Sequence, residues 1–112
     1  MVGIDIVDVL RMEGIMKRFG ERFLNRVFTD KELDYVRKRL KPQESLAGRF
    51  AAKEAFIKAY GQSAGFKEIE VLQQGGRPYI NFRGKVYHAV SISHERAYAV
   101  AVVIIGKERD SI

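Results

Sequence analysis

One segment of the sequence, from Glu44 to Tyr60, constrains the fold more than any other, because a helix there has almost no polar side. At about 100° per residue, small residues occupy one side of this helix and large apolar residues the other. A helix that is apolar nearly all round is normally buried. We therefore expect this helix, ending at Gly61, to lie at the centre of the domain. The small residues are Gly48, Ala52, Ala55 and Ala59, and the large ones are Leu46, Phe50 and Ile57, with Phe56 and Tyr60 adjoining.

The first part of the chain predicts a strand followed by a helix. Val2–Val7 is rich in β-branched residues and alternates weakly, which predicts a short strand with Ile4 and Ile6 on one face. Asp8 is suited to cap a following helix over Val9–Phe19. The apolar residues that recur at helical spacing in that helix are Leu10, Ile15, Met16 and Phe19.

A second short helix begins at the capping box Thr29-Asp30-Lys31-Glu32. In such a box the Thr29 side chain accepts from the third helical amide and the Glu32 side chain reaches back. Pro42 stops the helix, and the basic run Arg37-Lys38-Arg39 suits the negative end of the helix dipole. The apolar residues that we expect to face the core are Leu33, Val36 and Leu40.

The second half of the chain alternates between apolar and polar residues, as β-strands do. With the helices in the first half, this order predicts a single α+β domain over residues 1–112. In this domain an antiparallel sheet, which includes the N-terminal strand, wraps around the long central helix. The expected strands are Phe66–Leu72, Tyr79–Phe82, Ala89–Ser93 and Ala97–Ile105, with a turn at residues 75–78.

Composition narrows the chemistry that such a domain can perform. The chain of 112 residues has no cysteine and only 2 histidines. These counts exclude disulfides, thiolate nucleophiles and zinc sites built from cysteine or three histidines, so any metal would be a hard ion held by oxygen. The 20 Lys and Arg residues against 14 Asp and Glu give a net charge of +6, which indicates an anionic partner.

No membrane span or export signal is visible in the sequence. The longest apolar stretch, Ala97–Ile105, is far shorter than the roughly 20 residues that a membrane span needs. Asp5 and Asp8 interrupt the short apolar run at the N-terminus. We therefore expect a cytoplasmic protein without a membrane partner.

Two acidic residues stand in segments that are otherwise apolar. Asp5 lies within the N-terminal strand, where it either faces water on an edge strand or, in a central strand, needs a cation or several donors. Glu54 shares a side of the central helix with two alanines and Lys58. Its alternatives are a solvated i,i+4 ion pair with Lys58 and an inward position with room for a ligand. The apolar character of the rest of the helix favours the inward position.

Basic and glycine-rich segments provide candidate contacts for an anion. Arg49 and Lys53 lie one turn apart on the central helix, where they either extend along apolar surface or face a bound anion. His94 follows a strand, and a hydrogen bond to a loop is its simpler role. The segment Gly75-Gly76-Arg77-Pro78 is either a plain hairpin turn or a turn whose amides and Arg77 hold a phosphate. Two inward acids with these cations suggest a divalent cation bound together with a polyphosphate.

Five segments of the chain, taken in order, resemble those of holo-acyl-carrier-protein synthases, the short bacterial type of 4′-phosphopantetheinyl transferase. The resemblance covers essentially the whole chain. Its most specific part is the segment around Lys53-Glu54 together with the Asp5 segment. The five segments are Gly3-Ile4-Asp5-Ile6-Val7, Arg26-Val27-Phe28-Thr29 with Glu32, residues 48–56, Gly76-Arg77-Pro78, and Ser91-Ile92-Ser93-His94.

The resemblance implies the transfer of 4′-phosphopantetheine from coenzyme A to a serine of apo-acyl carrier protein in fatty acid biosynthesis, which leaves adenosine 3′,5′-bisphosphate. It implies a magnesium ion on Asp5 and Glu54, with manganese as the alternative ion. It places Lys58 beside the diphosphate or the leaving phosphate, so that Glu54 and Lys58 would be the catalytic residues. The base that takes the serine proton has three candidates: Glu54, a metal-bound water or another carboxylate.

The resemblance also implies two binding surfaces and an assembly. Family members of this length are homotrimers with coenzyme A bound between neighbouring subunits. Residues 62–65 are compact where relatives often have a longer glycine-rich loop, so no contact is transferred to them. The expected coenzyme A contacts are Arg49, Lys53, Lys58, Gly76, Arg77, Pro78, Ser93 and His94. The expected contacts of the first helix with the acidic acyl carrier protein are Arg11, Met12, Met16, Arg18, Phe19, Arg22 and Arg26.

Two other functions compete with this interpretation. The net charge alone would suit a small nucleic-acid-binding module, but Ala97–Ile105 has one tyrosine and no basic residue, unlike an RNA-binding sheet. A catalytically inactive interaction subunit would have no reason to retain Asp5, Glu54 and Lys58 together. We therefore expect an enzyme without a nucleic-acid partner.

Overall fold

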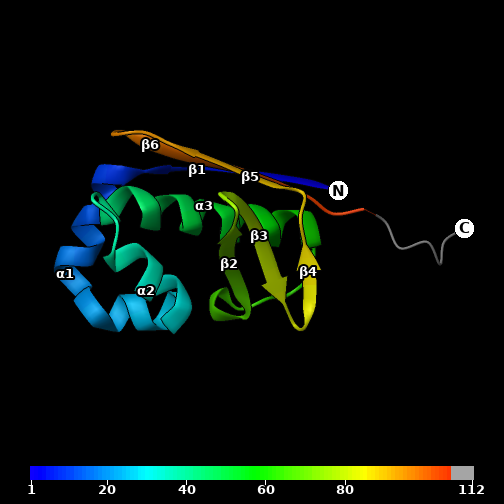
Figure 1. Ribbon diagram of the computed structural model, residues 1–112, viewed down its shortest axis with the longest axis horizontal. Helices are drawn as coiled ribbons and strands as arrows, with labels where there is room; N and C mark the ends of the chain where they lie inside the picture. Colours follow the sequence, from blue (N-terminus) through cyan, green and yellow to red (C-terminus); the bar gives the residue numbers. More distant parts are fainter. Residues whose placement is uncertain (107–112) are drawn as a thin grey trace, which may run out of the picture.

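The long helix lies at the centre of the computed structural model, which describes residues 1–106 (Figure 1). One sheet covers one side of this helix, and two helices and a second sheet cover the other. The predicted α+β class is therefore confirmed. The elements in chain order are β1 (Val2–Asp8), α1 (Val9–Val27), α2 (Asp30–Arg37), α3 (Pro42–Tyr60), the 3₁₀ turn η1 (Phe66–Glu68), β2 (Ile69–Gln74), β3 (Arg77–Phe82), β4 (Lys85–Tyr87), β5 (Val90–His94) and β6 (Tyr98–Ile104).

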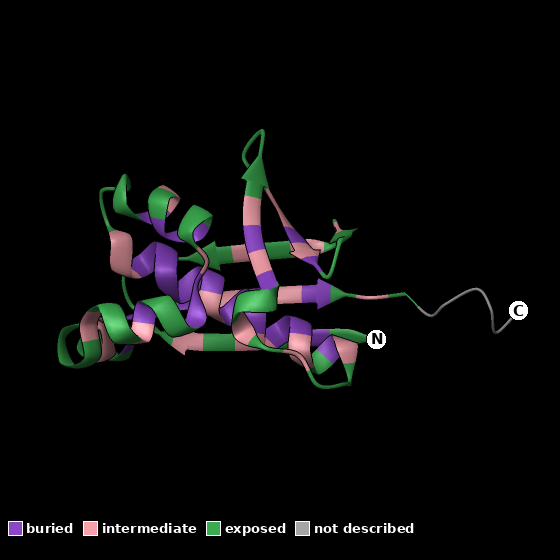
Figure 2. Ribbon diagram, turned by 90° about the horizontal axis from the view of Figure 1, so that it is seen from below, coloured by how far each residue is buried: buried purple, intermediate pink, exposed green. Residues whose placement is uncertain are grey.

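Helix α3 is buried along most of its length, as Figure 2 shows. It begins at Pro42, two residues earlier than expected from the sequence, because proline suits the first turn of a helix. It ends at Gly61, which adopts the left-handed conformation with φ 75° that terminates many helices. Within residues 1–106, neither α3 nor another helix is long and apolar enough to cross a membrane.

The strands form two antiparallel sheets rather than the single sheet that we expected. One sheet has the order β1-β6-β5 and the other the order β2-β3-β4. The chain passes from one sheet to the other after β4, because β5 pairs with β6 and not with β4. Among residues 1–106, strand β1 is thus an edge strand that pairs with β6 alone, with Asp5 opposite Ala101.

Strand β1 packs directly on the small-residue side of α3. A Cβ atom on Gly3 would lie 1.8 Å from the carbonyl oxygen of Ala55, so the strand can approach only because residue 3 is glycine. This contact turns the odd-numbered residues of β1, Asp5 included, toward α3. Ile4 and Ile6 share a face, as predicted, but this face points away from the core and is exposed.

Both short helices differ in detail from the sequence expectation. Helix α1 continues to Val27 through a kink at Gly20, whose φ is 56°. It buries Val9 and Met12, whereas Leu10, one of the apolar residues that recur at helical spacing, is 74% exposed. Helix α2 starts at the predicted capping box but ends at Arg37. Leu40 therefore lies beyond the helix and is 95% exposed, contrary to the expected inward position.

Candidate active site

Asp5 and Lys58 meet on the side of α3 that faces β1. The Lys58 ammonium donates to Asp5 Oδ1 at 3.1 Å and to the carbonyl oxygen of Ile4 at 2.9 Å. We considered two environments for Asp5, water beside an edge strand and a cation or several donors in a central strand, and the structure combines parts of both. Its strand is an edge strand, yet the Asp5 side chain is only 19% exposed and has a cation as its partner.

Glu54 lies beside this pair and has an unfavourable environment for a charged carboxylate. Burial raises its pKa, the charge of Asp5 raises it further, and Lys58 opposes these effects. Asp5 and Glu54 both line a hollow of about 280 Å³ between β1, α1 and α3. Two carboxylates that repel each other across one hollow suit a divalent cation. Among the described residues no group of three His, Cys, Asp or Glu could hold a metal, so such an ion would need further oxygen ligands from water or substrate.

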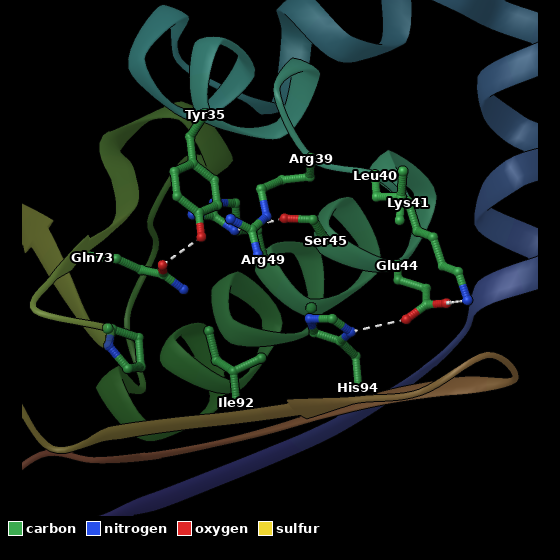
Figure 3. Close-up of a pocket in the computed structure, with 13 residues that line it drawn as sticks. Tyr35, Arg39, Leu40, Lys41, Glu44, Ser45, Arg49, Gln73, Ile92 and His94 are labelled. Carbon is green, nitrogen blue, oxygen red and sulfur yellow. Dashed lines mark hydrogen bonds and ion pairs between the residues drawn. The ribbon is translucent and has the colours of Figure 1, made fainter.

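A larger pocket, of about 640 Å³, lies elsewhere on α3 and shares no residue with this hollow (Figure 3). Its walls come from α2, from the first half of α3, from the β2–β3 hairpin and from β5. The predicted residues Arg49, Gly76, Pro78 and His94 are thus brought together. The complete lining is Tyr35, Arg39, Leu40, Lys41, Glu44, Ser45, Gly48, Arg49, Gln73, Gly76, Pro78, Ile92 and His94.

The charges of this pocket favour an anion. The one acid among the described lining residues, Glu44, is already engaged by His94 Nδ1 at 3.2 Å and by the Lys41 ammonium at 3.8 Å. Arg49 is only 4% exposed, and burial lowers its pKa. Its guanidinium donates to Ser45 Oγ at 3.0 Å, while its Nε has no hydrogen-bond partner among the described residues. A buried guanidinium with unused donors is suited to bind phosphate.

Lys53, which we expected to contact coenzyme A, is fully buried and lines neither of these two hollows. Its ammonium is fully buried and donates to Glu32 Oε1 at 2.8 Å and to the carbonyl oxygens of Phe66 and Ile69 at 2.9 and 2.6 Å. Glu32 in turn accepts from the amides of Thr29 and Val71. These bonds use all three ammonium donors, so in this structure Lys53 joins α2, α3 and β2.

Two other predicted coenzyme A contacts lie outside the pocket. Arg77 is exposed at the start of β3 and is absent from the described lining residues. Ser93 is exposed on β5, where side chains alternate, so it faces away from Ile92 and His94, which line the pocket. Lys58 lies with Asp5 instead. A single copy of residues 1–106 therefore does not gather all the predicted contacts in one place.

The outer surface of α1 carries the residues predicted to bind the carrier protein, with one correction. Met12 is 2% exposed and packs in the core, because the α1 row that contains Val9 and Met12 faces α3 and β6. Met16 is half-buried. The remaining predicted contacts are exposed: Arg11, Arg18, Phe19, Arg22 and Arg26. Phe19, Arg22 and Arg26, with Phe23, line a shallow hollow of about 220 Å³.

Several pocket residues were not predicted from the sequence. Arg39 belongs to the basic run Arg37-Lys38-Arg39, which we interpreted only as a match to the helix dipole. The positive charge of this run was the one sequence feature that could have indicated a pocket residue. Tyr35, Gln73 and Ser45 carried no signal, because nothing in their spacing shows that α2, β2 and α3 meet.

Comparisons with known proteins show the family of the chain. A model of the 4′-phosphopantetheinyl transferase superfamily matches residues 1–103 of the chain. The chain belongs to this family.

Similar proteins within the family share a more specific description. A holo-[acyl-carrier-protein] synthase of Halothermothrix orenii is 43% identical, over 92% of this chain and 94% of that protein. One of Thermodesulfovibrio yellowstonii is 46% identical, over 93% and 96%. The crystal structure of the Helicobacter pylori holo-[acyl-carrier-protein] synthase in complex with coenzyme A superposes with a TM-score of 0.84 at 31% identity, covering 95% of this chain and all of that one.

Proposed function

We propose that this chain, as one transferase domain, moves 4′-phosphopantetheine from coenzyme A to a serine of apo-acyl carrier protein. The observation that carries the proposal is the meeting of Asp5, Glu54 and Lys58, which come from segments about 50 residues apart. The relatives named above support the same reaction. The large basic pocket supplies the binding site for the nucleotide half of coenzyme A.

Asp5 and Glu54 are the residues that would hold a magnesium ion. Their repulsion across the small hollow, and the raised pKa of Glu54, are what a bound dication would relieve. When bound, magnesium supplies positive charge that offsets the charge of the coenzyme A diphosphate. Lys58, now paired with Asp5, is long enough and exposed enough to turn toward that diphosphate.

The reaction is a substitution at the β-phosphorus of coenzyme A. The serine oxygen forms a new bond to this phosphorus, and the bond to the oxygen that bridges the two phosphates breaks. Adenosine 3′,5′-bisphosphate leaves, and Lys58 stabilises the charge that develops on it. The serine proton must go to a base, for which the candidates are Glu54, a metal-bound water and another carboxylate.

A complete site would combine two copies of the chain. The acid cluster and the basic pocket share no lining residue within residues 1–106. The outer face of the β1-β6-β5 sheet is apolar and exposed, which is a feature of protein interfaces. Ser93 lies on this same face. We therefore propose a homotrimer in which this face is the contact between subunits. The exposed apolar residues of the face include Val2, Ile4, Ile6, Tyr98 and Ile104.

Mass spectrometry of an apo-acyl carrier protein tests the reaction. With this protein, coenzyme A and magnesium, the carrier should gain the mass of one phosphopantetheine, and chelation of the metal should stop the gain. Glu54→Gln should abolish the gain with folding intact, whereas Asp30→Asn, an acid-to-amide change at an exposed position, should retain it. If no bacterial carrier gains mass, the proposed enzyme activity is wrong.

Light scattering after gel filtration tests the assembly. The mass should be three times the chain mass of 12.8 kDa. Ile4→Lys places a charge in the proposed contact and should give monomers that lack transferase activity but still contain helix by circular dichroism. Fully active monomers would disprove a site shared between subunits.

A further inference from the structure

Tyr35 occupies a position in the large pocket that the family resemblance does not explain. It comes from α2, and its hydroxyl donates to Gln73 Oε1 on β2 at 2.6 Å, across the pocket (Figure 3). Its ring lies against two guanidinium groups: the Cζ atom of Arg49 is 4.2 Å from the ring centroid, and that of Arg39 is 5.2 Å away. Tyr35 thus contacts both arginines that line the pocket.

Arg49 depends on such a neighbour because it has no other strong partner. Among residues 1–106 it forms no ion pair with a carboxylate; it donates to Ser45, and the Tyr35 side chain beside it opposes the effect of burial on its pKa. A buried guanidinium with a single weak anchor has several side-chain orientations available. The face of an aromatic ring restricts these orientations and attracts the cation.

An aromatic ring also leaves the arginine free to bind an anion. A carboxylate at this place would occupy the N–H donors of Arg49 and neutralise its charge. The ring face of Tyr35 contacts the guanidinium instead and brings no negative charge to the pocket. The Tyr35 hydroxyl is neutral and donates its proton to Gln73.

We propose that Tyr35 is a positioning residue, which holds Arg49 in the orientation that binds a phosphate group of coenzyme A. The inference rests on the proposed function of the pocket. Through Gln73 the same side chain ties α2 to the hairpin that carries Gly76 and Pro78, so it fixes two walls of the pocket relative to each other. Tyr35 itself takes no part in the phosphoryl transfer.

Calorimetric titration with adenosine 3′,5′-bisphosphate tests this role directly. Tyr35→Leu, which removes the ring, should weaken binding about tenfold, as loss of a desolvated cation–π contact would. Tyr35→Phe keeps the ring and should stay within about threefold of the unchanged protein. In the transferase assay Tyr35→Leu should raise KM for coenzyme A with kcat nearly unchanged. Tyr79→Leu, a tyrosine change outside the pocket lining, is the matched control and should alter neither constant.

The possible outcomes separate the inference from the proposed function. If the unchanged protein binds no nucleotide and transfers no phosphopantetheine, the proposed function itself is wrong. If it does both and Tyr35→Leu binds the nucleotide equally well, or loses kcat rather than KM, the positioning role is overturned. Should Tyr35→Leu fail to fold, Tyr35→Met, with a long apolar side chain, replaces it in the same comparison.

Discussion

Two lysines on α3, five residues apart, form ion pairs with acids from distant segments, but the two pairs lie in opposite environments. The Lys53 ammonium and the Glu32 carboxylate are both fully buried, and each has further hydrogen bonds to the backbone. Lys58 is 54% exposed. Its partner Asp5 lies beside a second acid, Glu54, and the single charge of Lys58 does not neutralise both carboxylates. The first pair is electrostatically complete, whereas the second leaves charge that a ligand could compensate.

This difference separates a structural group from a functional one. Burial lowers the pKa of Lys53, and the charge of the nearby Glu32 carboxylate opposes this effect. A fixed and saturated cation cannot follow a substrate. Lys58 gains little by staying with Asp5, so under the proposed function it would be able to turn toward the phosphate.

The largest expected effect comes from breaking the buried pair. Lys53→Met leaves the Glu32 carboxylate buried without a counter-charge, so the free energy of unfolding should fall by about 3–5 kcal/mol. Urea denaturation followed by circular dichroism measures this change. Lys31→Met, on the exposed surface of α2, is the matched control and should change stability by less than about 0.5 kcal/mol.

A second variant sharpens this prediction. Glu32→Gln combined with Lys53→Met removes both charges and keeps a side-chain oxygen for the amides that Glu32 now accepts from. The double variant should be more stable than Lys53→Met alone. If the two variants are equally unstable, the cost of Lys53→Met arises from lost packing and not from the unpaired carboxylate.

Breaking the partly exposed pair of Lys58 and Asp5 should have a small effect on stability and a large effect on the transfer rate. Lys58→Met should lower the free energy of unfolding by less than about 1 kcal/mol, because water screens the bond to Asp5. The transfer rate should nevertheless fall by about 100-fold or more, since a cation at the leaving group is lost. Single-turnover kinetics and urea denaturation of the same sample measure both quantities. A large loss of stability with normal kinetics would make Lys58 a structural residue like Lys53.

The sequence predicted the local features of these two regions and missed their long-range contacts. The capping box at Thr29 and Glu32, the buried α3 and its end at Gly61 all follow from neighbouring residues, and the structure confirms them. Glu32 also binds Lys53, 21 positions away, and no periodicity indicates that contact. Because the contact with Glu32 could not be seen in the sequence, Lys53 was predicted as a ligand contact from its position in the motif next to Glu54.

Exposure was equally difficult to predict from periodicity. The spacing of Ile4 and Ile6 shows that they share a face of β1. It does not show that this face points away from α3. The orientation of β1 follows from Gly3, whose missing side chain lets the opposite face of the strand approach Ala55 on α3. Leu40 was assigned to the core because its spacing continues the pattern of α2, whereas the helix ends at Arg37.

The smallest expected effect concerns pH and Glu54. Because the pKa of Glu54 is raised in the folded chain, the folded state retains a proton at pH values where the unfolded state has lost it. The free energy of unfolding therefore falls as the pH rises from the usual glutamate range, near 4.3, to the raised pKa. Glu54→Gln removes this dependence, so the variant should equal the unchanged protein near pH 4 and exceed its stability at pH 7, by less than about 1 kcal/mol since Glu54 is only partly buried. Urea denaturation between pH 4 and pH 8 measures the difference, and added magnesium should reduce it by favouring the charged carboxylate. A variant that is less stable at pH 7 would mean that Glu54, like Glu32, is held by satisfied contacts, and the contrast between the two regions would not hold.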